Sequence, residues 1–589
     1  MEVLLIWPKH IMEKVIVKLR NIAVIVIGMM ALLTIGCTDK PTQISSDSVY
    51  FNGNIITLDA NDSVVEAIAI KDGRVLAFGD SADIIQMTDD NTLKVDLKGK
   101  TLIPGFVDAH SHLSGVAIQA ITANLLPAPD GPGQNIAALQ HALRDFIASS
   151  DMVKQHRVVI GFNYDDSQLE EGRHPNRHDL DAVSTDMPIM ITHQSGHLGV
   201  YNSKALEMFG ITAKSEDPPG GVIVREVGSR EPSGVMEENA HFAMLYKMIP
   251  PFTAEENIAA IQAAEMQYLS NGFTTIQDGK TDQATLSLMG KYAARVGFSA
   301  DIVAYADLAG MTDYSILDGP LHSSDYVSNF RIGGVKLTFD GSPQGKTAWF
   351  TQPYLVPPLG QDSSYSGYPA FTDTEAFKWY SLAYENNWQM LTHTNGDAAI
   401  DQLIDIATQA AEAFPKENRR TVMIHGQFLR EDQIADIQRL GIFPAFYPMH
   451  TFYWGDWHRD SVAGPERAEN ISPTGWMVER GIKFSIHSDA PVTFPNSMRI
   501  LDSAVNRTTR SGAVLGDKQR LRPMDALKAM TIWPAYQHFE ESSKGSLEIG
   551  KLADMVILDR NPLTVEPAKI IDIKVLQTIK EGVSVYVTK

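Results

Sequence analysis

The sequence is short of cysteine and of positive charge, and both shortages exclude classes of protein. Cys37 is the only cysteine, so the chain can form no internal disulfide and no cysteine-rich zinc site. Fifty lysine and arginine residues stand against 71 aspartate and glutamate residues, which gives a formal net charge of −21. We expect no nucleic acid partner, because the phosphate backbone would repel so acidic a chain. An enzyme with a cysteine nucleophile would depend on Cys37 alone.

Long apolar runs are scarce too, and the clearest one lies near the N-terminus. Residues 22–35 are almost wholly apolar, follow a basic segment and precede Cys37. This order is typical of a signal peptide, and the run is short for a membrane-spanning helix. Residues 34–37 resemble a bacterial lipoprotein signal, although Thr34 stands where leucine is more common. The resemblance implies a signal peptide over residues 1–37, cleaved before Cys37.

Lipidation of the Cys37 thiol would place the protein in the cell envelope, facing the periplasm or the outside. The membrane would then hold the protein through the lipid alone, and the choice between inner and outer membrane stays open. An uncleaved membrane anchor is the alternative interpretation. The true start is either Met1 or Met12, because residues 1–11 add nothing that a signal peptide needs.

The mature chain is too long for one simple core, so the sequence predicts several domains. Residues 38–47 are polar and read as a flexible tether. Short β-type runs with Asn-Gly and Asp-Gly turn signals fill residues 48–104, and short strand patterns return over residues 541–589. We expect both chain ends to build one small β-sandwich domain.

Residues 105–540 show a different pattern, in which helices alternate with apolar strands. Thr253 and Thr372 each begin a capping box, with glutamate three residues later, and each predicted helix is followed by a strand. This alternation is typical of a parallel sheet with crossover helices, and its length predicts an α/β fold of the (β/α)8 TIM-barrel type. The looser, Pro- and Gly-rich part at about 116–250 is interpreted as a large insertion.

Polar residues recur where predicted strands of the barrel end. His110 and His112 are two positions apart, so both imidazoles point to one face of a strand. The later strand ends supply Lys336, His393, His425 and Asp489. These ends meet at the mouth of a barrel, and imidazoles with a carboxylate suit a divalent metal, typically zinc. Each residue alone could be an ordinary polar residue at a loop start, but their joint recurrence favours a site.

The order and spacing of these residues resemble the amidohydrolase superfamily. The resemblance covers nearly all of residues 48–589 and is carried by residues 104–112, 195–206, 393–400, 487–492 and 550–554. It is most specific for the branch that includes N-substituted formamide deformylases. It implies that His110, His112 and Asp489 bind one metal ion and that His393 and His425 bind a second.

The same resemblance implies that Lys336 bridges the two ions after carboxylation by CO2. Unmodified, Lys336 would be a plain ammonium group beside a single ion, and this alternative stays open. A bound metal ion lowers the pKa of water towards 7, which supplies hydroxide, and Asp489 acts as the general base. Asp489 and Lys336 are therefore the expected catalytic residues. The expected reaction is hydrolysis of a C–N bond outside peptides, in a small amide or an N-acyl or N-formyl compound.

Four further residues are candidate substrate contacts. His193 and His197 lie in the insertion, whereas His450 and Trp454 lie in an aromatic segment after the strand that follows His425. Hydrogen bonding within the insertion and ordinary core packing are the respective alternatives. A homodimer is left open.

Two other functions compete with C–N hydrolysis. The same centre could hydrolyse an ester, lactone or phosphoester, or the chain could be a catalytically idle surface lipoprotein that binds a ligand. A deaminase is disfavoured, because Thr-Asn-Gly-Asp follows His393 and no extra glutamate is present there.

Overall fold

The computed structural model describes residues 45–358 and 360–588. The predicted signal peptide, the lipidation site at Cys37 and nearly all of the tether lie outside these residues. Within the described ranges, every helix is too short or too polar to cross a membrane.

Eight parallel strands form one curled sheet in which the spatial order follows the chain order, as in a TIM barrel. The strands are β8 (Phe106–Val107), β15 (Phe273–Thr281), β16 (Asp301–Asp307), β17 (Phe330–Thr338), β18 (Gln389–Thr394), β19 (Val422–His425), β20 (Phe443–Phe446) and β21 (Ser485–Ile486). Nearly all of their residues are buried, as expected for a parallel sheet covered on both faces. The predicted fold class is confirmed.

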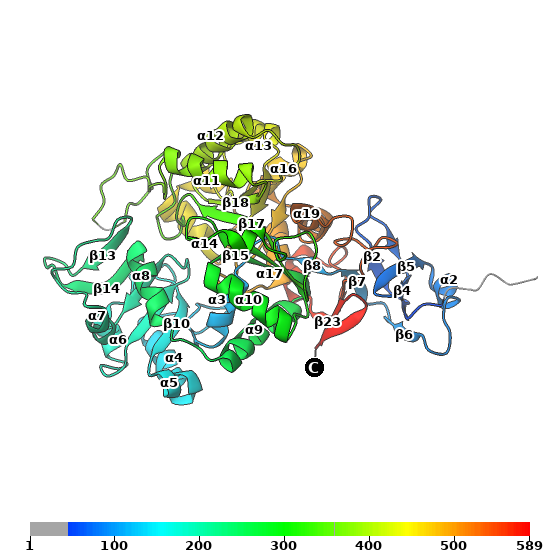
Figure 1. Ribbon diagram of the computed structural model, residues 1–589, viewed down its shortest axis with the longest axis horizontal. Helices are drawn as coiled ribbons and strands as arrows, with labels where there is room; N and C mark the ends of the chain where they lie inside the picture. Colours follow the sequence, from blue (N-terminus) through cyan, green and yellow to red (C-terminus); the bar gives the residue numbers. More distant parts are fainter. Residues whose placement is uncertain (1–44, 359, 589) are drawn as a thin grey trace, which may run out of the picture.

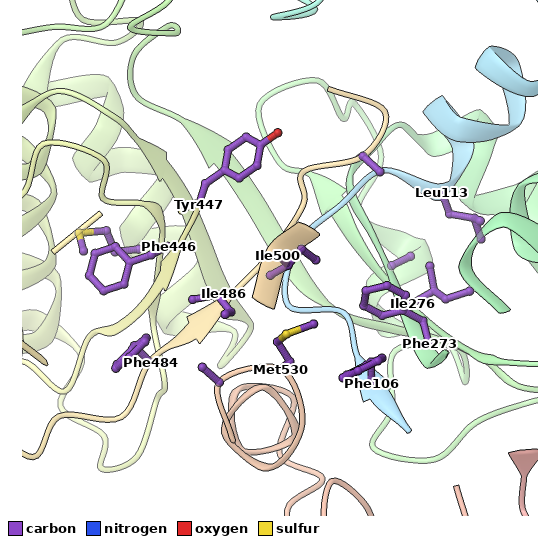
Figure 2. Packing of buried hydrophobic residues seen from close by; sticks show 14 of the residues in the cluster. Phe106, Leu113, Phe273, Ile276, Phe446, Tyr447, Phe484, Ile486, Ile500 and Met530 are labelled. Atoms are coloured by element: carbon purple, nitrogen blue, oxygen red, sulfur yellow. The ribbon is translucent and has the colours of Figure 1, made fainter. Parts of the chain in front are cut away.

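The segment at Ala529 and Met530 joins the first and last strands. Val107 N donates to Met530 O (2.9 Å) and Ile486 N donates to Ala529 O (3.0 Å). Figure 2 shows the Met530 side chain between Ile486 of β21 and Phe106 of β8. Beyond the strand ends, Asp489 N donates to His110 O (3.2 Å), which brings two predicted site segments together.

Helices pack around the sheet, and several of them begin at a residue whose side chain caps the helix. They include α3 (Leu113–Ala120), α9 (Ala254–Leu269), α10 (Gln283–Arg295), α11 (Asp373–Glu385), α12 (Asp397–Ala413), α13 (Ile434–Arg439) and α17 (Ser497–Asn506). Both predicted capping boxes are present, with Thr253 capping α9 and Thr372 capping α11.

The insertion folds around a sheet of its own, in the order β13-β14-β12-β11-β10-β9. Its strands are β9 (Ala123–Asn124), β10 (Val159–Tyr164), β11 (Ile189–His193), β12 (Leu198–Tyr201), β13 (Gly221–Arg225) and β14 (Pro232–Glu238). Its helices are α4 (Ile136–Ser149), α5 (Asp151–His156), α6 (Arg177–Asp181), α7 (Ser203–Phe209) and α8 (Asn239–Met248). In Figure 1 it forms the cyan to green lobe beside the barrel.

The two chain ends share a sheet on the opposite side of the barrel (Figure 1). Its order is β24-β23-β22-β7-β2-β3, and β7 (Thr101–Pro104) pairs antiparallel with β22 (Met555–Leu558). The remaining strands are β2 (Asn54–Ile56), β3 (Val64–Val65), β23 (Val575–Lys580) and β24 (Val583–Val587). A second sheet contains β1 (Ser48–Phe51), β4 (Ala67–Lys71), β5 (Arg74–Gly79) and β6 (Leu93–Asp96). The exact domain limits stay predictions.

Candidate metal centre

The two histidines after β8 are each held in one tautomer. His110 Nδ1 donates to Gln277 Oε1 (2.6 Å), and Gln277 Nε2 donates to Ala109 O (2.7 Å), which orients the amide. His112 Nδ1 donates to Gly279 O (2.6 Å). Because a carbonyl oxygen can only accept, both Nδ1 atoms carry the proton in neutral imidazole and both Nε2 atoms present a lone pair.

These lone pairs face a carboxylate. His110 Nε2 and His112 Nε2 lie 3.4 and 3.3 Å from Asp489 Oδ1, and the ligand atoms of the three residues all lie within 4.8 Å of one another. Two lone pairs and a carboxylate repel one another unless a proton or cation lies between them. Histidine nitrogens fixed through their other ring nitrogen are typical metal ligands, so these residues fit a divalent ion.

The structure brings the other three predicted residues to the same place. Lys336 Nζ lies 2.6 Å from His110 Nε2, and His425 Nε2 lies 3.8 Å from Asp489 Oδ2. The rings of His393 and His425 are 4.5 Å apart at their centroids. His425 and Asp489 adopt left-handed φ values of 73° and 54°, which are strained for non-glycine residues. All six predicted residues therefore surround one point at the strand ends.

Burial determines the charge states around this point. It lowers the pKa of His110, His393 and His425 well below the usual value, so all three rings are neutral at pH 7. Burial also lowers the pKa of Lys336 to about 7, which gives a substantial fraction of neutral amine. Neutral imidazoles are the form that binds metal.

Asp340 and Gln277 support the centre, and sequence reasoning did not assign them these contacts. Asp340 accepts from the backbone N–H groups of Asn395 (2.9 Å), Gly396 (2.8 Å) and Trp349 (3.1 Å), and its Oδ1 lies 3.3 Å from His393 Nδ1. Asp340 lies just beyond the end of β17, which is the signal that could have found it, whereas Gln277 lies in the middle of β15 and carries no such signal.

A cavity of about 340 Å³ borders the centre, and its lining includes His197, Glu238 and Asp340. His197 Nδ1 lies 2.9 Å from Glu238 Oε2, and the His197 ring lies 5.9 Å from that of His393. Burial raises the pKa of Glu238, but His197, Thr347 and Lys280 outweigh it and hold that pKa below the usual value. Sequence reasoning missed Glu238, which carried no motif.

His193 is placed differently, in a buried pair with acidic residues of the insertion. Its Nε2 lies 3.0 Å from Asp166 Oδ1, and its Nδ1 lies 2.9 Å from Ser195 Oγ, which can accept from the protonated ring. Asp165, Asp166 and His193 are close enough to hold a metal ion. Burial lowers the pKa of His193, but hydrogen bonds to Asp165 and Asp166 outweigh it and raise that pKa to about 9, so the protonated ring forms an ion pair instead.

The two aromatic-segment candidates are buried away from the cavity lining. Trp454 Nε1 donates to Asp165 Oδ2 (2.7 Å), and His450 Nδ1 lies 2.9 Å from His458 Nε2. The lining of the 340 Å³ cavity includes neither of them, nor His193, among the described residues. Their contact with substrate stays a prediction.

A model of the amidohydrolase family matches residues 94–586. The chain belongs to the amidohydrolase family. This amidohydrolase is 26% identical over 564 residues to the N-substituted formamide deformylase of Arthrobacter pascens, covering 92% of this chain and 98% of the relative. It is 24% identical to the putative amidohydrolase YtcJ of Bacillus subtilis, covering 92% and 99%.

Solved structures show the same fold. An uncharacterized metal-dependent hydrolase from Pyrococcus horikoshii superposes with a TM-score of 0.69 at 24% identity, covering 88% of this amidohydrolase and 99% of that chain. A second, from Pyrococcus furiosus, gives 0.68 at 23% identity, covering 88% and 100%. The family and the cluster of metal-ligating side chains make this amidohydrolase a metal-dependent hydrolase.

Proposed function

We propose that this amidohydrolase hydrolyses the C–N bond of a small amide or an N-acyl or N-formyl compound. The observation that carries the proposal is the pair of unprotonated Nε2 atoms of His110 and His112 facing the Asp489 carboxylate. The deformylase relative, which matches along almost its whole length, supports the bond class.

Six residues would hold the metal. His110, His112 and Asp489 would bind one divalent ion, His393 and His425 a second, and a carboxylated Lys336 would bridge them. Zinc suits such nitrogen and oxygen donors. The neutral amine of Lys336, populated because burial lowers its pKa to about 7, is the form that reacts with CO2. A bound divalent ion supplies a water of lowered pKa and polarises the substrate carbonyl.

The residues of the chain supply proton transfer and substrate orientation. Asp489 accepts the proton of the attacking water and passes it to the leaving nitrogen. Its backbone N–H donates to His110 O (3.2 Å), which holds the carboxylate at the histidine pair. His197, oriented by Glu238, is the insertion residue that we place against the substrate in the cavity.

A substrate panel with metal analysis tests the proposal. Purified protein is expected to contain a divalent metal and to cleave N-formyl or N-acetyl amides, with activity lost on chelation and restored by zinc or manganese. Matched esters, lactones and phosphoesters serve as comparison substrates. Cleavage of the esters without the amides would move the function to ester hydrolysis. Absence of bound metal, with no activation by added metal, would favour a ligand-binding protein.

A further inference from the structure

Lys280 is an unpaired cation in the cavity beside the centre. It lies near the end of β15 and lines the 340 Å³ cavity with Phe242, Tyr368 and Phe371. Within the described part of the chain, its ammonium group has no carboxylate within 4.0 Å and no hydrogen bond. Its one ring contact there is with Phe242, whose centroid lies 5.4 Å from Nζ. Glu238 interacts with this ammonium group only through space, so its lost hydration is not compensated by a contact ion pair.

The backbone is distorted at this residue. Lys280 has a left-handed φ of 56°, and the pairing of β15 with β16 shifts register between Asp278 and Thr281. Bulges of this kind redirect a side chain and are frequent next to active sites. Strained residues persist only where the surrounding structure imposes them, and they cluster at binding sites.

The carboxylates of the cavity do not form a contact ion pair with Lys280. Glu238 pairs with His197 at 2.9 Å, and Asp340 accepts three backbone N–H groups. Asp307 also lines the cavity, but it lies opposite Lys336 in the strand register and forms no ion pair with Lys280. An anion that enters the cavity therefore meets an ammonium group that forms no contact ion pair with any side chain among the described residues.

The cavity also has the size and wall of a small-molecule site. Its volume falls in the range of ligand pockets, and Phe242, Tyr368 and Phe371 supply aromatic surface. His197 and Asp340 belong to the same lining and adjoin His393, so a ligand seated here reaches the centre.

We propose that Lys280 binds an anionic group of the substrate, so that the enzyme acts on amides that carry a carboxylate, in the class of N-acylated aromatic amino acids. This inference rests on the proposed C–N hydrolysis and names its substrate class. Lys280 is a specificity residue, and it takes no part in bond cleavage.

A pair of substrates that differ only in the carboxylate tests the proposal. N-acetylphenylalanine carries it, and N-acetylphenethylamine is the same amide without it. We expect wild type to prefer the anion by about tenfold or more in kcat/KM. Lys280→Met should reduce kcat/KM for the anion about 10- to 100-fold and leave the neutral amide within about threefold, since a charged hydrogen bond is lost. Lys280→Arg should retain most of the preference.

Lys378 provides a matched control. It is an exposed lysine over the Trp379 ring, with Nζ 4.8 Å from the centroid, and the cavity lining does not include it. Lys378→Met should change neither substrate. No preference for the anion in wild type, or an equal loss on both substrates in Lys280→Met, would overturn the proposal.

Two further measurements separate this inference from the proposed function. O-acetyl-phenyllactate and phenethyl acetate form the corresponding ester pair. A charge preference seen only with the esters would refute C–N hydrolysis and support the role of Lys280. Calorimetry with the two amides on Asp489→Asn reads binding without turnover. We expect Asp489→Asn to bind N-acetylphenylalanine more tightly than N-acetylphenethylamine, and we expect the difference to disappear when Lys280→Met is added. Equal binding of both amides to Asp489→Asn would contradict the proposal.

Discussion

His110 is presented to the centre by a single side chain 167 residues away in sequence. Gln277 accepts the Nδ1 proton, and this hydrogen bond leaves Nε2 free to bind a metal ion. The tautomer of one ring, rather than its position alone, therefore makes the histidine a ligand. Metal binding by the predicted ligand His110 therefore depends on a glutamine, a residue type that does not by itself indicate a metal site.

Gln277→Ala should weaken metal affinity about 10- to 100-fold, because His110 loses the group that fixes its tautomer and orientation. Metal content after dialysis against a chelator measures the effect. Gln537→Ala is the matched control, since Gln537 Nε2 also donates to Ala109 O (2.7 Å). Equal metal loss in both variants would show that the loss results from a disturbed barrel core and not from the His110 tautomer.

Asp489→Asn should retain most of the bound metal while kcat falls by about 10²- to 10⁴-fold, because an amide cannot accept the proton of the attacking water. Steady-state kinetics and metal analysis on the same preparation provide the test. Near-wild-type turnover in a metal-loaded variant would contradict the assigned role.

His193 should make stability depend on pH. Burial lowers its pKa, but hydrogen bonds to Asp165 and Asp166 outweigh burial and raise it from 6.5 to about 9. Protonated His193 therefore stabilises the fold fully below about pH 6.5, and this contribution disappears as the pH rises through about 9. The difference corresponds to at most about 3 kcal/mol.

His193→Gln should lower the midpoint of thermal unfolding at pH 6 and flatten its decline between pH 6.5 and 9. His141→Gln, at an exposed histidine beside Asp145, should leave the profile unchanged. A variant profile parallel to that of wild type would refute the ion pair.

Among the elements, the end of β18 and the start of α12 shape one side of the centre. Gly396 lies directly before α12, and a Cβ there would lie 1.9 Å from Trp349 O. Its N–H and that of Trp349 both donate to Asp340, the residue beside His393. The absent side chain lets the long loop after β17 pack against the strand end.

Gly396→Ala should destabilise the protein by about 1–3 kcal/mol, because the added methyl group forces the loop backbone away. It should also reduce kcat, since Asp340 and His393 move with the loop. Gly79→Ala is the control, because no atom lies within 4 Å of the added Cβ. Thermal unfolding and kinetics measured together would detect the change, and unaltered values for Gly396→Ala would contradict the close approach.

For the molecule as a whole, a buried ion network joins the C-terminal sheet to the barrel. Asp301 of β16 pairs with Lys544 and, at 3.1 Å, with Lys580 of β23, and Lys544 also lies 3.1 Å from Glu540. Asp301, Lys544 and Lys580 are all 5% exposed or less. β23 belongs to the sheet that both chain ends share. The network therefore connects the barrel strand β16, the segment around Lys544 and the C-terminal strand β23.

Asp301→Ala should cost about 1–3 kcal/mol of stability, because Lys544 and Lys580 each lose one buried carboxylate while Glu540 and Asp554 remain beside them. The midpoint of thermal unfolding should fall by several degrees while kcat of the folded protein stays unchanged. Asp47→Ala, in the exposed pair with Lys71, should have no measurable effect. Equal midpoints for the two variants would contradict a joining role.

Sequence periodicity predicted the strands, the capping boxes at Thr253 and Thr372, and the six residues at the strand ends. These features depend on neighbours a few residues apart, or on the rule that strand ends of a barrel converge. Gln277, Glu238 and Lys280 escaped prediction, because their roles arise from contacts or strain that no local pattern encodes. The sequence offered His193 and His197 equally as candidate substrate contacts. Of these two residues, only His197 lines the cavity.

Hydrophobic periodicity and residue chemistry are local properties, and they were enough to predict the fold class, the family resemblance and the polar residues at the strand ends. The tertiary structure alone decided which nitrogen of each histidine is free, which charges are neutralised and which cation stands unpaired in the cavity. Those properties depend on distances and burial, which follow from packing between segments far apart in the chain.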